Sequence, residues 1–300
     1  MVAKVILNPY SNRWQAKASW PQVELALNDA GIEFELAASE KRGQLTELAY
    51  DAGRQGYSPI LIAGGDGTIG EVVNGLVKAL PSGEGQIGPV GVIPLGTAND
   101  FAHNLKLPLD IPGSVALIKA GNTRPIDVCR VNGLHFINNS AAGLEPTITV
   151  IQEGMVWAKG TLRYLLAALV GIQRNPSWQA RLEWEGGFYQ GPLSLVTVGN
   201  GARTGGLFHM TPHADPADGM LTFVHAYRKT KLELLTTLPK TMKPGPGSYV
   251  EKEGVYEINS PWLKVHLETP SPAHTDGEVF SHGIQDLEYS VLPGKLQLLC

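Results

Sequence analysis

Short apolar runs alternate with amphipathic stretches over the first 120 residues. Val2–Leu7, Ile32–Ala37, Ile60–Ala63 and Val90–Ile93 are aliphatic and have the length of strands. The stretches between them place apolar residues at helical spacing, which predicts a helix that ends at Gly31 and further helices over Gln44–Gln55 and Ile69–Leu80. Strands that alternate with helices predict a parallel sheet covered by helices.

The pattern changes near Thr123 to short β runs separated by turn residues. Two hairpins are predicted around Asn132-Gly133 and Gly186-Gly187, with the strand pairs Ile126–Val131 with Leu134–Asn138, and Trp178–Trp184 with Tyr189–Val198. Other runs and two helices complete this part: Met220–Ala226, Val255–Ile258, Leu263–Leu267 and Lys295–Leu299, with helices over Gly160–Gln173 and near Leu232–Pro239. We therefore expect two domains: a Rossmann-like α/β domain over residues 1–125 and a β-rich domain, antiparallel and sandwich-like, over residues 126–300.

The composition is that of an ordinary folded protein and limits the function classes. Hydrophobic residues make up 43% of the 300 and charged residues 17%. A formal net charge of −4 disfavours nucleic acid as a partner, because nucleic-acid binding needs a basic surface. Two cysteines are too few for a disulfide framework or a cysteine zinc site. The longest apolar run, Tyr164–Ile172, has nine residues where a membrane-spanning helix needs about 20, so the cytoplasm is the expected compartment.

The strongest chemical signal is the loop Gly64-Gly65-Asp66-Gly67-Thr68, which joins a buried strand to a helix. Glycines let the backbone approach a ligand closely, and the N-terminus of the next helix favours negative charge. Both features indicate a phosphate site. Asp66 would repel phosphate unless a cation lies between them, which indicates Mg²⁺. A plain turn needs only one or two glycines, and the P-loop pattern is absent because no Gly-Lys-Ser/Thr follows.

Two more loops follow strand ends on the same predicted sheet edge. Asn8-Pro9-Tyr10-Ser11-Asn12 follows the first strand, and Pro94–Asp100 follows the fourth. Each supplies hydroxyl and amide groups. Ligands of open α/β sheets bind outside the carboxyl ends of the strands, so three such loops on one edge favour a ligand site over three unrelated turns.

These motifs, taken in order, resemble the diacylglycerol kinase catalytic-domain family, which includes bacterial lipid kinases and sphingosine kinases. The matching segments are Asn8-Pro9-x-Ser11, Gly64–Thr68 followed by Glu71-Val72-Val73-Asn74-Gly75, Pro94–Ala102, Gly199-Asn200-Gly201 with Gly205-Gly206, Pro212–Leu221, and Asp276-Gly277-Glu278. The glycine loop alone is shared with NAD kinases. Its combination with Pro94–Ala102 and the late Asp-Gly-Glu is much more specific.

The resemblance implies a role for each matching position. ATP would be held by Asn8, Ser11, Ser39, Gly64, Gly65, Asp66, Gly67, Thr68, Ile69, Gly70, Thr97, Asn99 and Asp100. Asp66 would contact the catalytic Mg²⁺, and Asp100 and Asp127 resemble further acids of the active-site network. Asp276 would be the general base for the lipid hydroxyl, with Glu278 beside it. Asp215, Asp218 and the carbonyl of Met220 match a second, structural Mg²⁺ site.

Some positions depart from the family pattern or have a simpler explanation. Asn12 stands where glycine is usual and tolerates left-handed φ, whereas Gly70 stands where asparagine is frequent. Both changes affect the fine geometry of nucleotide binding. Alone, Thr275-Asp276-Gly277 and Asp215–Gly219 are also typical of ordinary turns, and only the ordered series favours a functional role.

The sequence leads to a lipid kinase that transfers the γ-phosphate of ATP to a diacylglycerol-like hydroxyl. The alternatives are an NAD kinase-like phosphotransferase, a sphingoid-base kinase on the same fold, and a non-catalytic nucleotide or lipid sensor, which has no use for a base such as Asp276. The apolar stripe Leu162, Leu165, Leu166, Leu169 and Val170 predicts core packing, the lining of a lipid pocket or, with Lys159, Arg163 and Arg174 nearby, a peripheral contact with the membrane. An exposed strand edge in the second domain would also allow a homodimer.

Overall fold

The computed structural model describes residues 2–81, 83–155, 160–174 and 176–300, with the side chains of 163 and 165–174 in the third range. Its N-terminal part holds four parallel strands in the order β4-β3-β1-β2. The elements of this part are β1 (Ala3–Leu7), α1 (Gln15–Asp29), β2 (Phe34–Ala38), α2 (Gln44–Arg54), β3 (Ile60–Gly64), α3 (Asp66–Ala79), β4 (Ile87–Pro94), α4 (Asp100–Asn104) and α5 (Ile111–Ala120).

Helices cover both faces of this parallel sheet, which explains why its strands are apolar throughout. On one face α2 and α3 pack on the sheet through residues such as Ala49, Val72 and Leu76. On the other face α1 and α5 pack through Val23, Leu27 and Val115. All five residues of β3 are buried, as expected for a central parallel strand.

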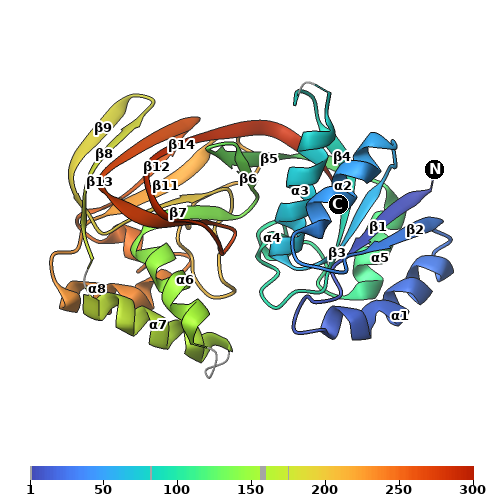
Figure 1. Ribbon diagram of the computed structural model, residues 1–300, viewed down its shortest axis with the longest axis horizontal. Helices are drawn as coiled ribbons and strands as arrows, with labels where there is room; N and C mark the ends of the chain where they lie inside the picture. The colour runs from blue at the N-terminus through green and yellow to red at the C-terminus, as the bar shows by residue number, and fades with distance from the viewer. Residues whose placement is uncertain (1, 82, 156–159, 175) are drawn as a thin grey trace.

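The C-terminal part is rich in antiparallel strands and carries helices on one side (Figure 1). Its strands are β5 (Thr123–Val131), β6 (Leu134–Phe136), β7 (Asn139–Gly143), β8 (Trp178–Trp184), β9 (Gly187–Leu193), β10 (Leu195–Gly199), β11 (Leu221–Ala226), β12 (Val255–Ser260), β13 (Trp262–Thr275) and β14 (Glu278–Leu299). Its helices are α6 (Leu144–Gly154), α7 (Gly160–Arg174), α8 (Lys231–Thr237) and the 3₁₀ turns η1 (Leu238–Met242) and η2 (Tyr249–Glu251). The predicted fold class is thus confirmed.

Strand β14 joins the two parts into one continuous sheet. It begins beside the Asp276-Gly277 turn, arches across the molecule and ends against β4 (Figure 1). There Leu296 and Leu298 pair in parallel with β4 and in antiparallel with β5. The run Lys295–Leu299 was expected as a short strand of the antiparallel part. It pairs in antiparallel with β5, as expected, but it is the end of the long strand β14 and also pairs in parallel with β4. The boundary expected at residue 125 stays a prediction, and it falls within β5.

Two other expectations differ from the structure, and four elements were not predicted. The helix expected from Ile69 begins at Asp66, so Asp66, Gly67 and Thr68 form its first turn. The single strand expected over Tyr189–Val198 is two, because β9 pairs with β8 whereas β10 lies between β7 and β11. Strand β7 and helices α4, α5 and α6 were not predicted.

The leucine-rich stripe that was expected to pack the Gly160–Gln173 helix against the core is not the buried face of this helix. Ala167, Ala168 and Ile172 are the buried residues of α7, whereas Leu169 is 47% exposed. Small residues on the buried face let α7 approach α6 closely, and a Cβ on Gly171 would lie 2.9 Å from Ile148. Lys159 and the side chain of Leu162 lie outside the described residues.

Candidate active site

The carboxyl ends of the parallel strands bring the three predicted loops together. Leu95 donates its amide hydrogen to the carbonyl of Gly64 at 2.8 Å, which holds the β4 loop against the glycine loop. The two loops touch through glycines, because a Cβ on Gly96 would lie 2.5 Å from the Cα of Gly65. Glycine at both positions is therefore required by this close approach.

Thr68 connects the first loop to the glycine loop. Its hydroxyl accepts a hydrogen bond from the side-chain amide of Asn8 at 3.0 Å and lies 3.2 Å from the hydroxyl of Ser11. Ser39 is buried nearby and donates its amide hydrogen to the carbonyl of Leu7. Five predicted nucleotide-binding positions, Asn8, Ser11, Ser39, Gly64 and Thr68, thus gather at one edge of the sheet.

The β4 loop is fixed by its own asparagine and by the first loop. Asn99 has a left-handed backbone and accepts a hydrogen bond from the amide of Gly96 at 2.9 Å. Thr97 donates its hydroxyl hydrogen to Asn12 at 3.1 Å. Asn12 has a φ of 49°, which confirms that this position needs the left-handed conformation that glycine and asparagine tolerate. Ile69, in contrast, is buried in the core, so only its backbone is available to a ligand.

Asp276 comes from the turn between β13 and β14 and faces the first turns of α3. One of its carboxylate oxygens accepts hydrogen bonds from the amides of Asn138 (2.8 Å) and Asn139 (3.1 Å), and the other from the amide of Ile137 (3.0 Å). A Cβ on Gly70 would lie 3.1 Å from its Oδ2. Burial raises the pKa of Asp276 to about 7, and the charge of Asp66 adds to this rise against the three hydrogen bonds.

A pKa near neutrality suits a general base, because the group is ionised at working pH yet basic enough to accept a proton. Glu278 lies on the same side of the turn, since a Cβ on Gly67 would be 3.5 Å from its Oε1. The carboxylate of Glu278 is 54% exposed and lies 3.8 Å from Arg42. The two predicted catalytic acids therefore lie opposite the glycine loop, Asp276 partly buried and Glu278 open to solvent.

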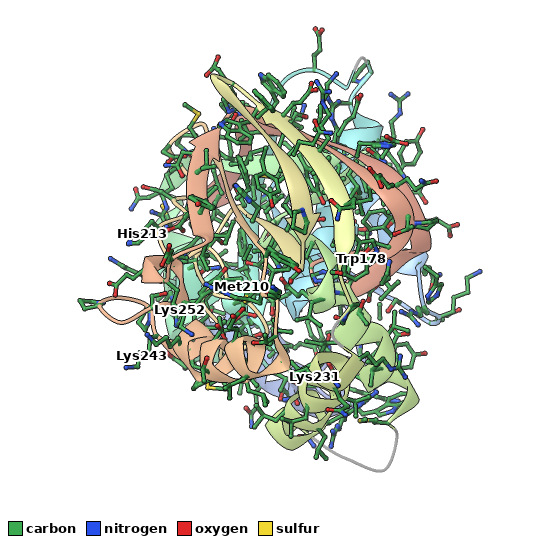
Figure 2. The ribbon with its side chains drawn as sticks, turned by 90° about the vertical axis from the view of Figure 1, so that its left-hand side faces the viewer. Trp178, Met210, His213, Lys231, Lys243 and Lys252 are labelled. Atoms are coloured by element: carbon green, nitrogen blue, oxygen red, sulfur yellow. The ribbon has the colours of Figure 1, made fainter. Side chains whose placement is uncertain are left out.

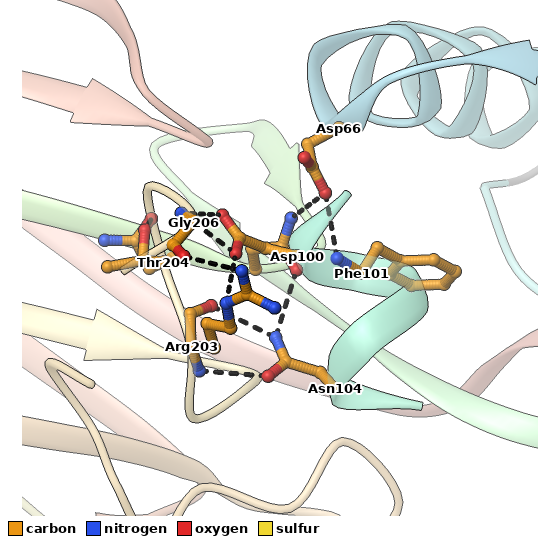
Figure 3. A network of polar contacts seen from close by, with 9 residues as sticks. Asp66, Asp100, Phe101, Asn104, Arg203, Thr204 and Gly206 are labelled. Atoms are coloured by element: carbon orange, nitrogen blue, oxygen red, sulfur yellow. Dashed lines mark hydrogen bonds and ion pairs between the residues drawn. The ribbon is translucent and has the colours of Figure 1, made fainter. Parts of the chain in front are cut away.

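Asp66 and Asp100 form the centre of a polar network (Figure 3). Asp66 accepts hydrogen bonds from the amide of Phe101 at 2.8 Å and from the side chain of Asn138 at 3.0 Å. Asp100 accepts from the amide of Gly206 and lies 3.3 Å from Arg203. Burial, followed by the charge of Asp66, raises the pKa of Asp100 to about 6. The two carboxylates are close enough to interact electrostatically and have one guanidinium, that of Arg203, for compensation, an arrangement that favours a bound cation.

A cavity of about 550 Å³ lies between the two parts of the molecule. It is lined by residues of both parts, among them Arg13, Asp66, Thr97, Asp100, Asn138, Asn139, Glu145, Arg163, Arg203, Phe208, His274 and Asp276. Four predicted site residues, Asp66, Thr97, Asp100 and Asp276, thus share one cavity. A second, apolar cavity of about 60 Å³ adjoins it, since Glu145 and Phe208 line both.

The predicted second metal site lies elsewhere, at a turn that Asp127 stabilises. Asp215 and Asp218 accept hydrogen bonds from the amides of Ala217 and Met220. Burial raises the pKa of Asp218, and the charges of Asp215 and Asp127 add to the rise. Asp127 accepts from the amides of Gly219 and Gly294, both at 2.7 Å. The resemblance grouped Asp127 with the active-site acids, but its carboxylate contacts this turn and Gly294 of β14.

Sequence reasoning missed several residues that hold the site together. Asn138 joins Asp66 to Asp276 through its side chain and its amide. Asn139 donates its side-chain amide to Glu145 at 2.9 Å, and Glu145 also lies 3.2 Å from His274. The available signal was the pair Asn138-Asn139 at the carboxyl end of an expected strand. Arg203, just before Gly205-Gly206, gave no signal of its own.

Two family models match this chain, one over each part. The diacylglycerol kinase catalytic domain matches residues 2–131, and the YegS C-terminal NAD kinase beta sandwich-like domain matches residues 139–300. The chain belongs to the diacylglycerol kinase family. It is a lipid kinase of that family, and the family implies the use of ATP.

Relatives of this lipid kinase cover most of its length. A "Diacylglycerol kinase" of Staphylococcus aureus (strain bovine RF122 / ET3-1) is 30% identical over 77% of this chain and 72% of its own. One from Bacillus subtilis (strain 168) is 29% identical over 92% and 89%, and a "Probable lipid kinase YegS" of Escherichia fergusonii is 29% identical over 91% and 88%. A solved structure of a putative diacylglycerol kinase from Bacillus anthracis has the same fold, with a TM-score of 0.79, 22% identity, and coverage of 99% of this chain and 96% of its own.

The described part of the lipid kinase has neither a membrane-spanning helix nor a cluster of three metal-binding side chains. No described helix is long and apolar enough to cross a membrane. Among the described residues, no three acidic, histidine or cysteine side chains converge on one metal position. Mg²⁺ commonly binds one or two protein carboxylates together with substrate phosphates, so the oxygen donors at Asp66 fit such an ion.

Proposed function

We propose that this protein transfers the γ-phosphate of ATP to the hydroxyl of a diacylglycerol-like lipid. The observation that carries the proposal is the position of Asp276, a partly buried carboxylate with a pKa near 7 that faces the glycine loop across the cavity. A general base at this position can remove the proton of an alcohol acceptor. The apolar cavity that adjoins through Phe208 supports an acceptor with hydrocarbon chains.

In the proposed mechanism the loops position ATP and Asp276 activates the acceptor. Amides of the glycine loop and the N-terminus of α3 bind the phosphates, with Thr68, Asn8 and Ser11 holding the loops in register. Asp276 removes the proton of the lipid hydroxyl as its oxygen forms the new bond to phosphorus, and the bond from phosphorus to ADP breaks. Mg²⁺ held at Asp66 would neutralise phosphate charge. We further propose Asp215, Asp218 and the Met220 carbonyl as the second Mg²⁺ site, which would stabilise their turn.

A sphingoid base is a second candidate acceptor, and Glu145 favours it. Glu145 lines both cavities and is buried, and its Oε2 has no hydrogen-bond partner among the described residues. An ammonium group on the acceptor would compensate the charge of this carboxylate, whereas diacylglycerol carries no charge.

The test is to incubate the protein with labelled ATP and Mg²⁺ and to offer diacylglycerol, a sphingoid base and NAD separately. We expect a labelled phospholipid from diacylglycerol, at a rate that Asp276→Asn abolishes. Label in the sphingoid base alone would support the second acceptor. Label in NAD alone, or the same lipid product from the Asp276→Asn variant, would refute the proposal. ATP bound without any product would indicate a sensor.

A further inference from the structure

Helix α8 exposes two leucines while its other face covers the apolar cavity. Leu232 is 69% exposed and Leu235 is 42% exposed. They lie three residues apart and so on one face of the helix. Leu234 and Leu238, four residues apart, instead line the cavity that adjoins the catalytic cleft. One short helix thus separates an exposed apolar face from the space next to the active site.

Positive charge is concentrated in the segment of the chain that contains α8, although the chain is acidic as a whole. Residues 228–252 contain six lysines and arginines and two glutamates, a net charge of +4, whereas the whole chain has −4. Figure 2 shows Lys231, Lys243 and Lys252 around α8 and the turns that follow it. The ammonium of Lys252 lies 3.0 Å from the hydroxyl of Thr237 at the end of the helix.

The cations are close enough to affect one another. Burial lowers the pKa of Lys252, and the charges of Arg228 and Lys240 lower it further, against the opposing charge of Glu233. Like charges destabilise one another, so this clustering has an energetic cost that a negatively charged surface would offset. Exposed leucines amid lysines have the composition of a helix that lies in a membrane interface.

We infer that α8 and the turns after it dock the protein on an anionic lipid bilayer, with Leu232 and Leu235 inserted between headgroups. We assign this face to a bilayer and not to a protein partner because the same helix borders the cavity that leads to the cleft. Docking there would bring bilayer lipid beside the acceptor site. This inference deepens the proposed function and rests on it for the identity of the delivered molecule. The binding step itself can be measured without any catalysis.

The experiment is co-sedimentation of the full chain with vesicles of phosphatidylcholine, with and without phosphatidylglycerol. We expect binding to the anionic vesicles that weakens as NaCl is raised. Leu232→Ser with Leu235→Ser should lower the partition coefficient by about tenfold or more, and Lys231→Ala or Lys243→Ala by about fivefold each. Leu25→Ser on α1, 61% exposed, is the matched control and should bind as the unmodified protein does.

Catalysis separates this inference from the proposed function. The double leucine variant should phosphorylate a short-chain, water-soluble diacylglycerol at the unmodified rate and lose activity only on acceptor embedded in vesicles. Unchanged vesicle binding by the double variant would overturn the inference. So would equal binding to neutral vesicles, or an oligomer that the variant loses, which would assign the face to a second copy of the chain. Vesicle binding without any kinase activity would leave the docking face supported and refute the proposed function.

Discussion

Replacing Asp276 with asparagine should remove activity and make stability less sensitive to pH. The pKa of this carboxyl is raised from 3.8 to about 7 in the folded protein, chiefly by burial. Between these values the folded protein retains a proton that the unfolded chain has released. The free energy of unfolding therefore falls as pH rises through this window, and the loss is complete above about pH 7.

The magnitude follows from the size of the shift. About three pKa units at 1.36 kcal/mol each correspond to about 4 kcal/mol of destabilisation by the ionised carboxylate. An asparagine side chain at this position carries no charge, so the variant does not lose this stability. The new amide group would oppose the N–H of Ile137 at a cost of about 1–3 kcal/mol. That cost is present at every pH, so it cancels when two pH values are compared.

Urea unfolding at about pH 5 and about pH 9 measures the difference. Relative to the unmodified protein, Asp276→Asn should be more stable at the higher pH than at the lower one by about 3 kcal/mol, because about one of the three pKa units is already lost at pH 5. The control is Glu278→Gln, which removes a carboxylate that is half exposed and should show little pH-dependent difference. The kcat/KM of the unmodified enzyme should rise with pH and level off above about 7. An equal stability difference at both pH values would refute the burial argument, and turnover by the variant would refute the assignment of the base.

Three further predictions concern the groups around this base. Gly70→Ala should lower kcat about tenfold or more with little change in stability, because the added carbon would lie 3.1 Å from Asp276 Oδ2 and displace this carboxylate. An unchanged kcat would show that catalysis tolerates the displacement. Arg203→Ala should lower the free energy of unfolding above about pH 6, where Asp100 is ionised in the folded protein, and should lower it less below that pH. Urea unfolding that shows the opposite trend would refute a stabilising ion pair between Arg203 and Asp100. Thr68→Val should raise the KM for ATP several-fold without changing the pH profile of kcat/KM, since it removes the hydroxyl that joins two loops. An unchanged KM in steady-state kinetics would refute this role of the hydroxyl.

Local sequence signals were sufficient where the structure is determined by neighbours along the chain. The buried strand Ile60–Gly64 and its glycine loop were predictable, because apolar runs and glycines act locally. The gathering of Asn8, Ser11 and Thr68 also followed, since parallel strands end at one edge. The start of α3 was misjudged because glycines at helix N-termini resemble a loop.

Long-range pairing was not predictable from the same signals. Nothing near Leu296 indicates that it pairs with Ile87, because strand register depends on partners that are remote in sequence. The three amides that hold Asp276 come from residues 137–139, and no side-chain pattern records where a backbone N–H points. The resemblance located Asp276 in the site, whereas its hydrogen bonds required coordinates.

The course of β14 has a consequence for how the chain folds during synthesis. Strand β4 pairs with β3 on one side and with the end of β14 on the other. The ribosome makes β14 long after β4, so the nascent N-terminal part exposes the unpaired edge of an apolar strand until the last strand arrives. Unpaired edges of this kind recruit other chains. We therefore expect truncations that remove residues 295–300 to aggregate, even though every loop that we propose to bind ATP is retained.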